Sequence, residues 1–221
     1  MRDTYHEQLA GMADELIEMS RISGSAVSKA TSALLDADLA AAEAVIAGDE
    51  EVNALYKGID ESAVMLLAQQ QPVASDLRAI LTGLRMSNDL ERVGDYAVHV
   101  AKVAKRRHPA SVVPVELRPT MLEMGQAAAR IVVKAGTVIA TRDLTLAAQL
   151  KADDDTIDDL HAHLLQTLLS SKHDFSSEVT IDLALVGRYY ERLADHATSI
   201  SNAVTYLVTG EHNDPESYAA E

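Results

Sequence analysis

The stretch NDLERVGDYA at residues 88–97 returns as RYYERLADHA at residues 188–197. Glu, Arg, Asp and Ala coincide at a shift of 100 positions, as from 91 to 191. A second similarity lies upstream of each copy, where DEEVNALY at residues 49–56 resembles DDTIDDLH at residues 154–161. Internal self-similarity indicates a repeated structural unit. We therefore expect two homologous halves that meet in the Pro-rich segment 109–119.

Apolar residues recur at spacings of three and four along both halves, which is typical of amphipathic helices. The pattern predicts three helices in each half. The first has its apolar positions between Leu9 and Ala30, and the second has them between Val52 and Leu66. The others are expected near 75–107, 121–141, 156–171 and 177–209. Ser75 is the expected N-cap of the third helix. Pro72 ends the second helix, because proline cannot extend one.

The expected fold class is all-α, with two tandem homologous three-helix bundles. Residues 1–110 are assigned to the first bundle and residues 111–210 to the second. Residues 211–221 are polar and acidic and are expected to fray. We expect the segment 109–119 to be an exposed linker that proteases cut early.

The composition excludes several classes of protein. Lys and Arg number 19 and Asp and Glu 34, which gives a formal charge of −15 and argues against nucleic acid as a partner. The chain has no cysteine, so disulfides, iron–sulfur clusters and thiolate zinc sites are excluded. No apolar run approaches the roughly 20 residues that a membrane span needs, and no signal peptide is visible. We expect a cytoplasmic protein without direct membrane insertion.

The candidate functional residues are acidic side chains four positions apart on helices. Glu91 and Asp95 lie on one helical face, opposite the apolar stripe, and Glu191 and Asp195 repeat this arrangement. The preceding helix of the second half adds Asp154 and Asp158. If neighbouring helices lie side by side, these carboxylates converge on one spot.

In the first half the position that matches Asp154 is Asp49, while Asn53 stands at the position that matches Asp158. Oxygen-rich clusters of this kind suit hard cations, or iron and manganese. An ordinary solvated helix face, with Arg92 and Arg192 compensating the acids, is the competing interpretation.

Catalytic patterns are missing from the sequence. There is no Glu-x-x-His, which counts against a ferritin-like di-iron oxidase, and no nucleotide-binding glycine motif. A metal-dependent phosphohydrolase or oxidase that uses the surface carboxylates is the alternative function, and it would need an open coordination position and a base. A purely structural helical adaptor is a third interpretation. We expect a protein that is not an enzyme.

At ERVGD (91–95) and ERLADHA (191–197) the sequence strongly resembles the PhoU family. The segments QPVASDLR (71–78) and GDEEVN (48–53) support the resemblance, which runs from about residue 5 to residue 210. It implies two similar three-helix bundles whose acidic pairs bind metal, often as multinuclear iron or zinc clusters. Carried over by position, the ligands are Asp154, Asp158, Glu191 and Asp195 in the second half and Asp49, Glu91 and Asp95 in the first.

The sequence departs from this pattern at two positions of the first half. Asn53 replaces an acidic member, and Tyr96 stands where the second copy has His196. We therefore expect the second site to bind metal better than the first. The expected cofactors are divalent or ferric ions (iron, zinc, manganese or magnesium), without an organic cofactor.

The resemblance also implies a function and partners. Members of this family regulate phosphate uptake and repress phosphate-starvation signalling when phosphate is plentiful. The implied partners are the ATP-binding subunit of the phosphate ABC transporter and a PhoR-type sensor histidine kinase. A second copy of the chain, in a homodimer, is a further expected partner.

Overall fold

The computed structural model describes residues 2–69, 72, 74–172 and 174–211, and these residues form an all-helical fold. The elements are α1 (Arg2–Asp36), α2 (Leu39–Gln69), α3 (Ala74–Arg107), the 3-10 turn η1 (Val115–Leu117), α4 (Arg118–Thr141), α5 (Leu144–Leu168) and α6 (Ser177–Thr209). No strand occurs among the described residues. The predicted all-α class is confirmed, and the expected tail over 212–221 lies outside the described residues.

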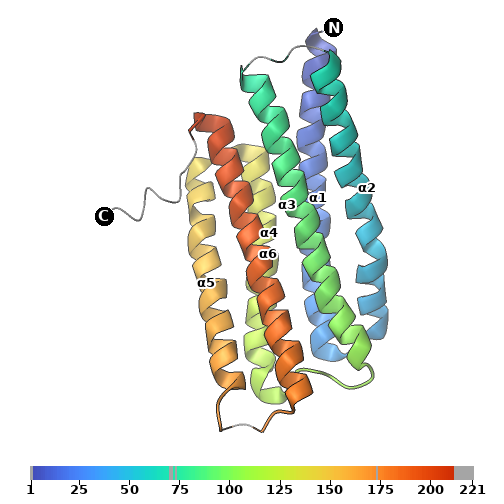
Figure 1. Cartoon of the computed structure of the whole chain (residues 1–221), viewed down its shortest axis with the longest axis vertical. Helices are drawn as coiled ribbons and strands as arrows, with labels where there is room; N and C mark the ends of the chain where they lie inside the picture. Colours follow the sequence, from blue (N-terminus) through green and yellow to red (C-terminus); the bar gives the residue numbers. More distant parts are fainter. Residues whose placement is uncertain (1, 70–71, 73, 173, 212–221) are drawn as a thin grey trace, which may run out of the picture.

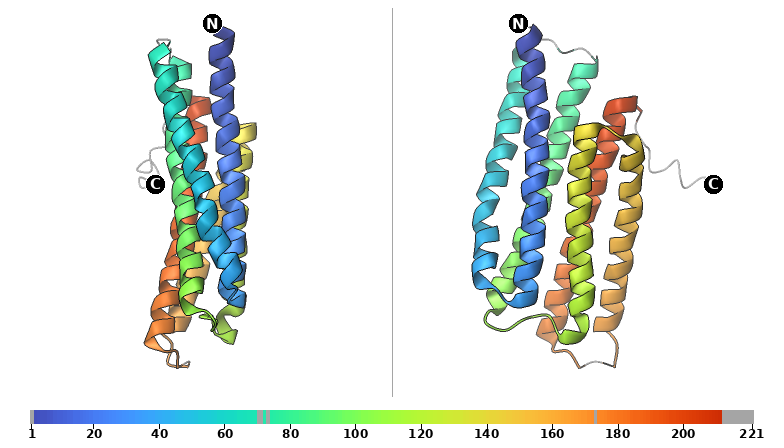
Figure 2. Two further views of the ribbon diagram at one scale, coloured as in Figure 1. Left: turned by 90° about the vertical axis from the view of Figure 1, so that its right-hand side faces the viewer. Right: turned by 180° about the vertical axis from the view of Figure 1, so that it is seen from behind.

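The six helices form an elongated body in which the first half (α1–α3) lies beside the second half (α4–α6) (Figure 1). Helices α3 and α6 run side by side on one broad face, and α1 and α4 run side by side on the opposite face (Figure 2). Helix α2 flanks α1 and α3 at one edge, while α5 flanks α4 and α6 at the other. The arrangement agrees with two tandem three-helix bundles. No helix among the described residues has the length and apolar character needed to cross a lipid bilayer.

Several helices begin before the predicted positions. Helix α2 begins at Leu39 rather than Val52, and α5 begins at Leu144 rather than Thr156. The early turns of both helices are rich in alanine and charged residues, and the predicted pattern left out their few large apolar residues, such as Val45 and Leu150, which are buried. Asp143 caps α5 by accepting hydrogen bonds from the backbone amides of the next turn.

The third helix also starts earlier than predicted. Helix α3 begins at Ala74, so Ser75 lies within its first turn and is not the N-cap. In the second half, Ser176 does cap α6, because its Oγ accepts a hydrogen bond from the Val179 amide at 3.3 Å.

The linker between the halves is buried at some residues and exposed at others. Val112 and Val113 are 3% and 4% exposed, and Leu117 is buried as well. These apolar residues pack against the end of the bundle, whereas Val115 is 79% exposed. Early cleavage of this segment by proteases stays a prediction.

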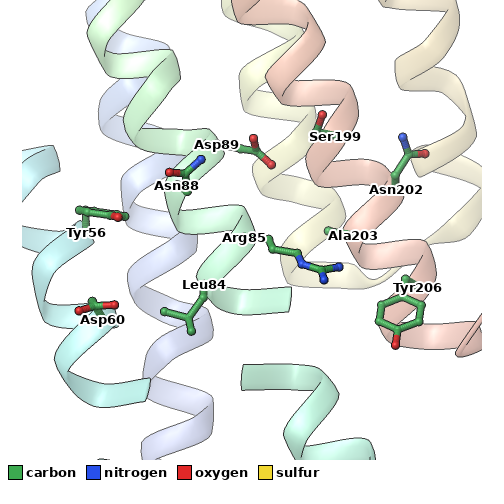
Figure 3. A pocket seen from close by; sticks show the side chains of 10 residues that line it. All are labelled: Tyr56, Asp60, Leu84, Arg85, Asn88, Asp89, Ser199, Asn202, Ala203 and Tyr206. Atoms are coloured by element: carbon green, nitrogen blue, oxygen red, sulfur yellow. The ribbon is translucent and has the colours of Figure 1, made fainter. Parts of the chain in front are cut away.

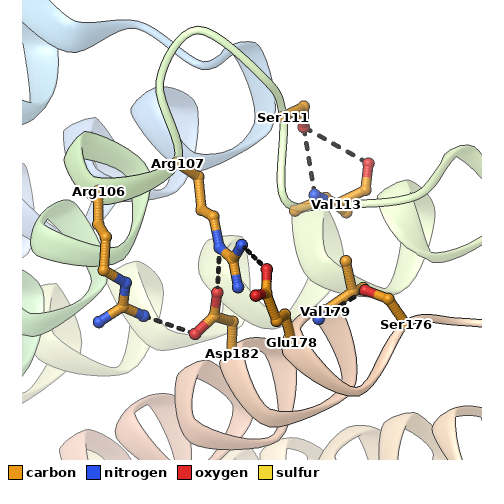
Figure 4. Close-up of polar contacts among 8 residues, drawn as sticks. All are labelled: Arg106, Arg107, Ser111, Val113, Ser176, Glu178, Val179 and Asp182. Atoms are coloured by element: carbon orange, nitrogen blue, oxygen red, sulfur yellow. Dashed lines mark hydrogen bonds and ion pairs between the residues drawn. The ribbon is translucent and has the colours of Figure 1, made fainter.

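Ion pairs join the end of α3, before the linker, to the start of α6 in the second half (Figure 4). Asp182, near the start of α6, is 4% exposed and accepts from Arg106 and Arg107 at 2.5 Å each. Arg107 also pairs with Glu178 at 2.6 Å. The basic end of α3 is thereby tied to the acidic start of α6, where both charges also suit the helix dipoles.

Small residues allow α1 and α4 to approach each other closely. A Cβ atom built on Gly125 would lie 2.3 Å from Thr31 Cγ2, and one built on Gly136 would lie 1.9 Å from Ser20 Oγ. Thr31 is buried, and its hydroxyl lies 2.7 Å from the hydroxyl of Tyr190 on α6. The two halves are therefore joined by a packed, hydrogen-bonded interior.

We predict that Gly125→Ala destabilises the protein by about 1–3 kcal/mol, because the added methyl group overpacks the fixed, β-branched Thr31 side chain. Alanine is about 1 kcal/mol better than glycine in a helix, so the steric cost opposes the intrinsic preference. Gly11→Ala is the matched control, since nothing lies within 4 Å of its added Cβ. Urea denaturation measures both variants, and a Gly125→Ala protein as stable as Gly11→Ala would contradict the prediction.

Candidate metal centres

The structure places the predicted acidic residues on two pairs of adjacent helices. Asp154 and Asp158 lie on α5, which packs against Glu191 and Asp195 on α6. We call these four residues the C-terminal cluster. Asp49 on α2 faces Glu91 and Asp95 on α3, and these three form the N-terminal cluster.

The carboxylates of the C-terminal cluster are close enough to repel one another. Burial, followed by the charges of Asp158 and Asp195, raises the pKa of Asp154 to about 6. Burial and the charge of Asp195 also raise the pKa of Glu191 and of Asp158. Acidic side chains of α5 and α6 are thus near enough for their charges to raise one another's pKa, a repulsion that a positive charge would relieve.

Two oxygen atoms of this cluster lack a hydrogen-bond donor. Asp154 Oδ1 and Glu191 Oε2 are buried and have no hydrogen-bond partner. Buried carboxylate oxygens without a donor are unfavourable unless a positive charge meets them. His161 also lies close by, since its charge lowers the pKa of both Asp158 and Glu191. This donor set of carboxylates and an imidazole suits iron, manganese or zinc.

Arginines hold part of both clusters. Arg192 Nη1 donates to Asp195 Oδ2 at 3.0 Å, and Arg92 Nη1 donates to Asp95 Oδ2 at 2.8 Å. Arg188 pairs with Glu191 in the same way. The compensation that the competing interpretation expected from Arg92 and Arg192 is thus present. Among the described residues, no three Asp, Glu or His side chains are arranged as they would be around a metal ion.

The N-terminal cluster is better satisfied without a cation. Asn53 Nδ2 donates to Asp49 Oδ2 at 2.9 Å, so the amide supplies a donor where the second half has a further carboxylate. Burial raises the pKa of Asp49 and of Glu91, while the Asn53 hydrogen bond lowers that of Asp49. The difference between the two halves that the sequence predicts has this physical basis.

A group of rings between α3 and α6 was not predicted as a unit. Asp89 Oδ1 lies 2.9 Å from His196 Nδ1, and Tyr96 stacks on Tyr189 with centroids 6.1 Å apart. The repeat in the sequence relates these two contacts and could have indicated them. Its shift of 100 residues equates 89 with 189 and 96 with 196, so the two contacts are related by the pseudo-symmetry of the halves.

A pocket of about 580 Å³ lies beside the contact between α3 and α6, which we call the seam (Figure 3). None of the cluster carboxylates lines this pocket. Its lining comes from α2, α3 and α6 and includes Tyr56, Arg85 and Asn202. The pocket and the acidic clusters are therefore separate features of the surface.

We predict that Asp154→Asn stabilises the protein at pH 7 in the presence of EDTA. The pKa of Asp154 is raised in the folded protein, so the native state binds more protons than the unfolded state between about pH 4 and 6. Stability should then fall as pH rises through this window, and the charged carboxylate should cost about 1–2 kcal/mol at pH 7 after allowance for solvent screening. Asp155→Asn, at an exposed position of α5, is the control.

Thermal unfolding at pH 5 and pH 7 measures the effect. The Asp154→Asn advantage should shrink at the lower pH. An Asp154→Asn protein no more stable at pH 7 than the Asp155→Asn control would contradict the prediction.

Comparison with known proteins follows the same division into halves. The family model described as the PhoU domain matches twice, over residues 16–104 and 121–204. A phosphate-specific transport system accessory protein, PhoU homolog 2 of Mycobacterium bovis, is 42% identical over 210 residues, which cover 95% of this chain and 99% of that protein. PhoU homolog 1 of Mycobacterium leprae is also 42% identical and is covered to 95%.

Solved structures agree. The crystal structure of PhoU from Pseudomonas aeruginosa superposes with a TM-score of 0.82 at 29% identity, covering 94% of this chain and all of that one. The PhoU structure from Streptococcus pneumoniae shares the fold with a TM-score of 0.86 at 23% identity, covering 95% and 99% of the two chains. Both halves match one domain model and nearly the whole chain aligns with these relatives, so the chain belongs to the PhoU family.

Proposed function

We propose that this protein regulates phosphate uptake and represses the phosphate-starvation response when phosphate is plentiful. The observation that carries the proposal is the alignment of 95% of the chain with relatives named as accessory proteins of the phosphate-specific transport system. The Streptococcus pneumoniae protein, which shares the fold, is named a phosphate transport system regulatory protein. The proposed role is that of a cytoplasmic binding protein rather than an enzyme.

The proposed partners are the ATP-binding subunit of the phosphate ABC transporter and a PhoR-type sensor kinase. The two halves present similar helices, so one molecule offers two related surfaces and could bridge two proteins. The formal charge of −15 favours partners with basic contact surfaces outside the arginine-bearing regions. A homodimer is part of the proposal as well.

The two acidic clusters are proposed to hold divalent or ferric ions. Asp154, Asp158, Glu191 and Asp195 would hold the ions of the second half, and Asp49, Glu91 and Asp95 those of the first. A bound cation would neutralise the repulsion among these carboxylates and join α5 to α6, or α2 to α3. The buried, unpartnered oxygens of Asp154 and Glu191 support this assignment.

We expect Glu191→Ala with Asp195→Ala to lower the bound metal while leaving the helical content unchanged. The Glu191 side chain is 15% exposed and that of Asp195 is 39% exposed, and neither belongs to the fully buried residues of α6, so the helix should be kept. Asp155→Ala with Asp159→Ala is the matched control, because it removes two exposed carboxylates at the same spacing. Glu91→Ala with Asp95→Ala should lose less metal, since Asn53 already weakens that cluster.

Elemental analysis of the purified proteins, together with circular dichroism, measures these differences. Equal metal content in the wild type and the Glu191/Asp195 variant would show that these carboxylates are only a solvated face.

The regulatory role predicts a phenotype. Deletion of the gene should leave phosphate-starvation genes expressed in high phosphate, because the repressing contacts are lost. Reporter expression in high and low phosphate measures this, in a strain from which any paralogue has also been removed. Normal repression in that strain would overturn the proposed function.

A further inference from the structure

A groove runs between α1 and α2 at the surface of the first half. The two helices lie side by side (Figure 2), and the groove has a volume of about 460 Å³. Its lining residues follow the same spacing on both helices, which places each set on one helical face. They are Gln8, Gly11, Met12 and Glu15 on α1 and Gly58, Glu61, Ser62 and Met65 on α2.

Glycines keep this groove open. A Cβ atom built on Gly11 or on Gly58 would have no neighbouring side chain within 4 Å. Met12 is buried and Met65 is 53% exposed, so the groove also presents apolar, adaptable thioether side chains. Open space beside apolar side chains fits a large apolar group from outside the chain.

The carboxylate of Glu15 is an unsatisfied polar group of the groove. Its Oε2 atom is buried and has no hydrogen-bond partner among the described residues. Burial raises the pKa of Glu15. A buried carboxylate oxygen without a donor is unfavourable, and an ammonium or guanidinium group from outside would satisfy it.

The surroundings of the groove are negatively charged. Residues 3–20 contain five acidic side chains and neither Lys nor Arg. On α2, Lys57 pairs with Glu61 at 3.9 Å, but these side chains are 78% and 69% exposed, so the contact is weak and can exchange for another. The groove therefore lies in a negative field that attracts a basic partner.

We propose that the α1–α2 groove binds a basic amphipathic helix of a partner protein. A lysine of that helix would reach Glu15, and a large apolar side chain of the same helix would fill the space beside Gly58. The inference deepens the proposed function and rests on it, since the helix would belong to a protein that this chain regulates.

The combination of features favours a helix over a small organic cation. A free amine would meet the Glu15 carboxylate but leave the apolar space beside Met12 and Met65 empty. An amphipathic helix meets both, because it carries apolar and basic side chains at the three- and four-residue spacing that grooves between helices accept.

The test measures binding of a fluorescein-labelled peptide to the full-length protein by fluorescence anisotropy. The peptide is an alanine-based helix with leucines and lysines along one face. Glu15→Gln should weaken binding about tenfold at low salt, because the charge that the lysine meets is removed while the shape of the side chain is kept. Glu123→Gln is the matched control, since it removes the same charge at an exposed position of α4 outside the groove.

Gly58→Leu tests the apolar part of the groove. The added side chain should occupy the open space and weaken binding by a similar factor, without a clash inside the protein. Gly48→Leu is the control, because Gly48 lies on the same helix, is exposed and also has no neighbouring side chain within 4 Å of an added Cβ. Circular dichroism and thermal unfolding check that every variant folds.

Absence of binding to the wild type would overturn the inference. Equal losses in Glu15→Gln and Glu123→Gln would overturn it too, because the peptide would then respond to net charge alone. Unchanged binding to Gly58→Leu would show that the peptide lies elsewhere. Equally tight binding of a peptide with alanine in place of its leucines would show a small-cation site in place of a docking groove. The proposed regulation of phosphate uptake would survive each of these results, since the deletion phenotype tests it separately.

Discussion

The close contact of α1 with α4 is the constraint on which the rest of the architecture depends. Glycines on α4 face Thr31 and Ser20 on α1, so the helices approach until these small side chains meet. This approach brings Tyr190 of α6 within hydrogen-bond distance of Thr31. Helices α3 and α6 are then held side by side on the other face, and the acidic edges of the bundles are fixed at either side of the seam.

Charge is distributed unevenly over this frame. Carboxylates gather at the α2–α3 and α5–α6 contacts, where burial raises the pKa of Asp49 and Asp154. Arginines gather along the seam between these contacts and at the basic end of α3. A protein with a strongly negative net charge therefore still presents positive groups at defined places, and each of them lies within reach of an acidic partner on its own chain.

The sequence predicts the helices and the duplication because each depends on spacing within one helix or on a repeat. The burial and the ion pairs of Asp182 could not be predicted in this way. Nothing near it along the chain marks it as buried, and its two arginine partners are 75 and 76 residues away. The burial of Val112 and Val113 could not be predicted for the same reason. The prolines indicate a linker but do not show the surface against which it packs. The pairing of Asp195 with Arg192 was visible as a competing interpretation, but only coordinates show that it forms.

The seam between α3 and α6 also shows what joining two copies in one chain permits. Two identical halves related by a twofold axis would have to form the same pair of residues at both equivalent contacts. In this chain the two equivalent contacts have become different: one is the carboxylate–imidazole pair of Asp89 and His196, and the other is the stack of Tyr96 on Tyr189. The contacts are neighbours, because the Tyr96 ring also stacks on His196 with centroids 5.9 Å apart. Fusion of the halves has thus allowed a polar bond at one contact and an aromatic stack at the other, which a dimer of identical halves could not form.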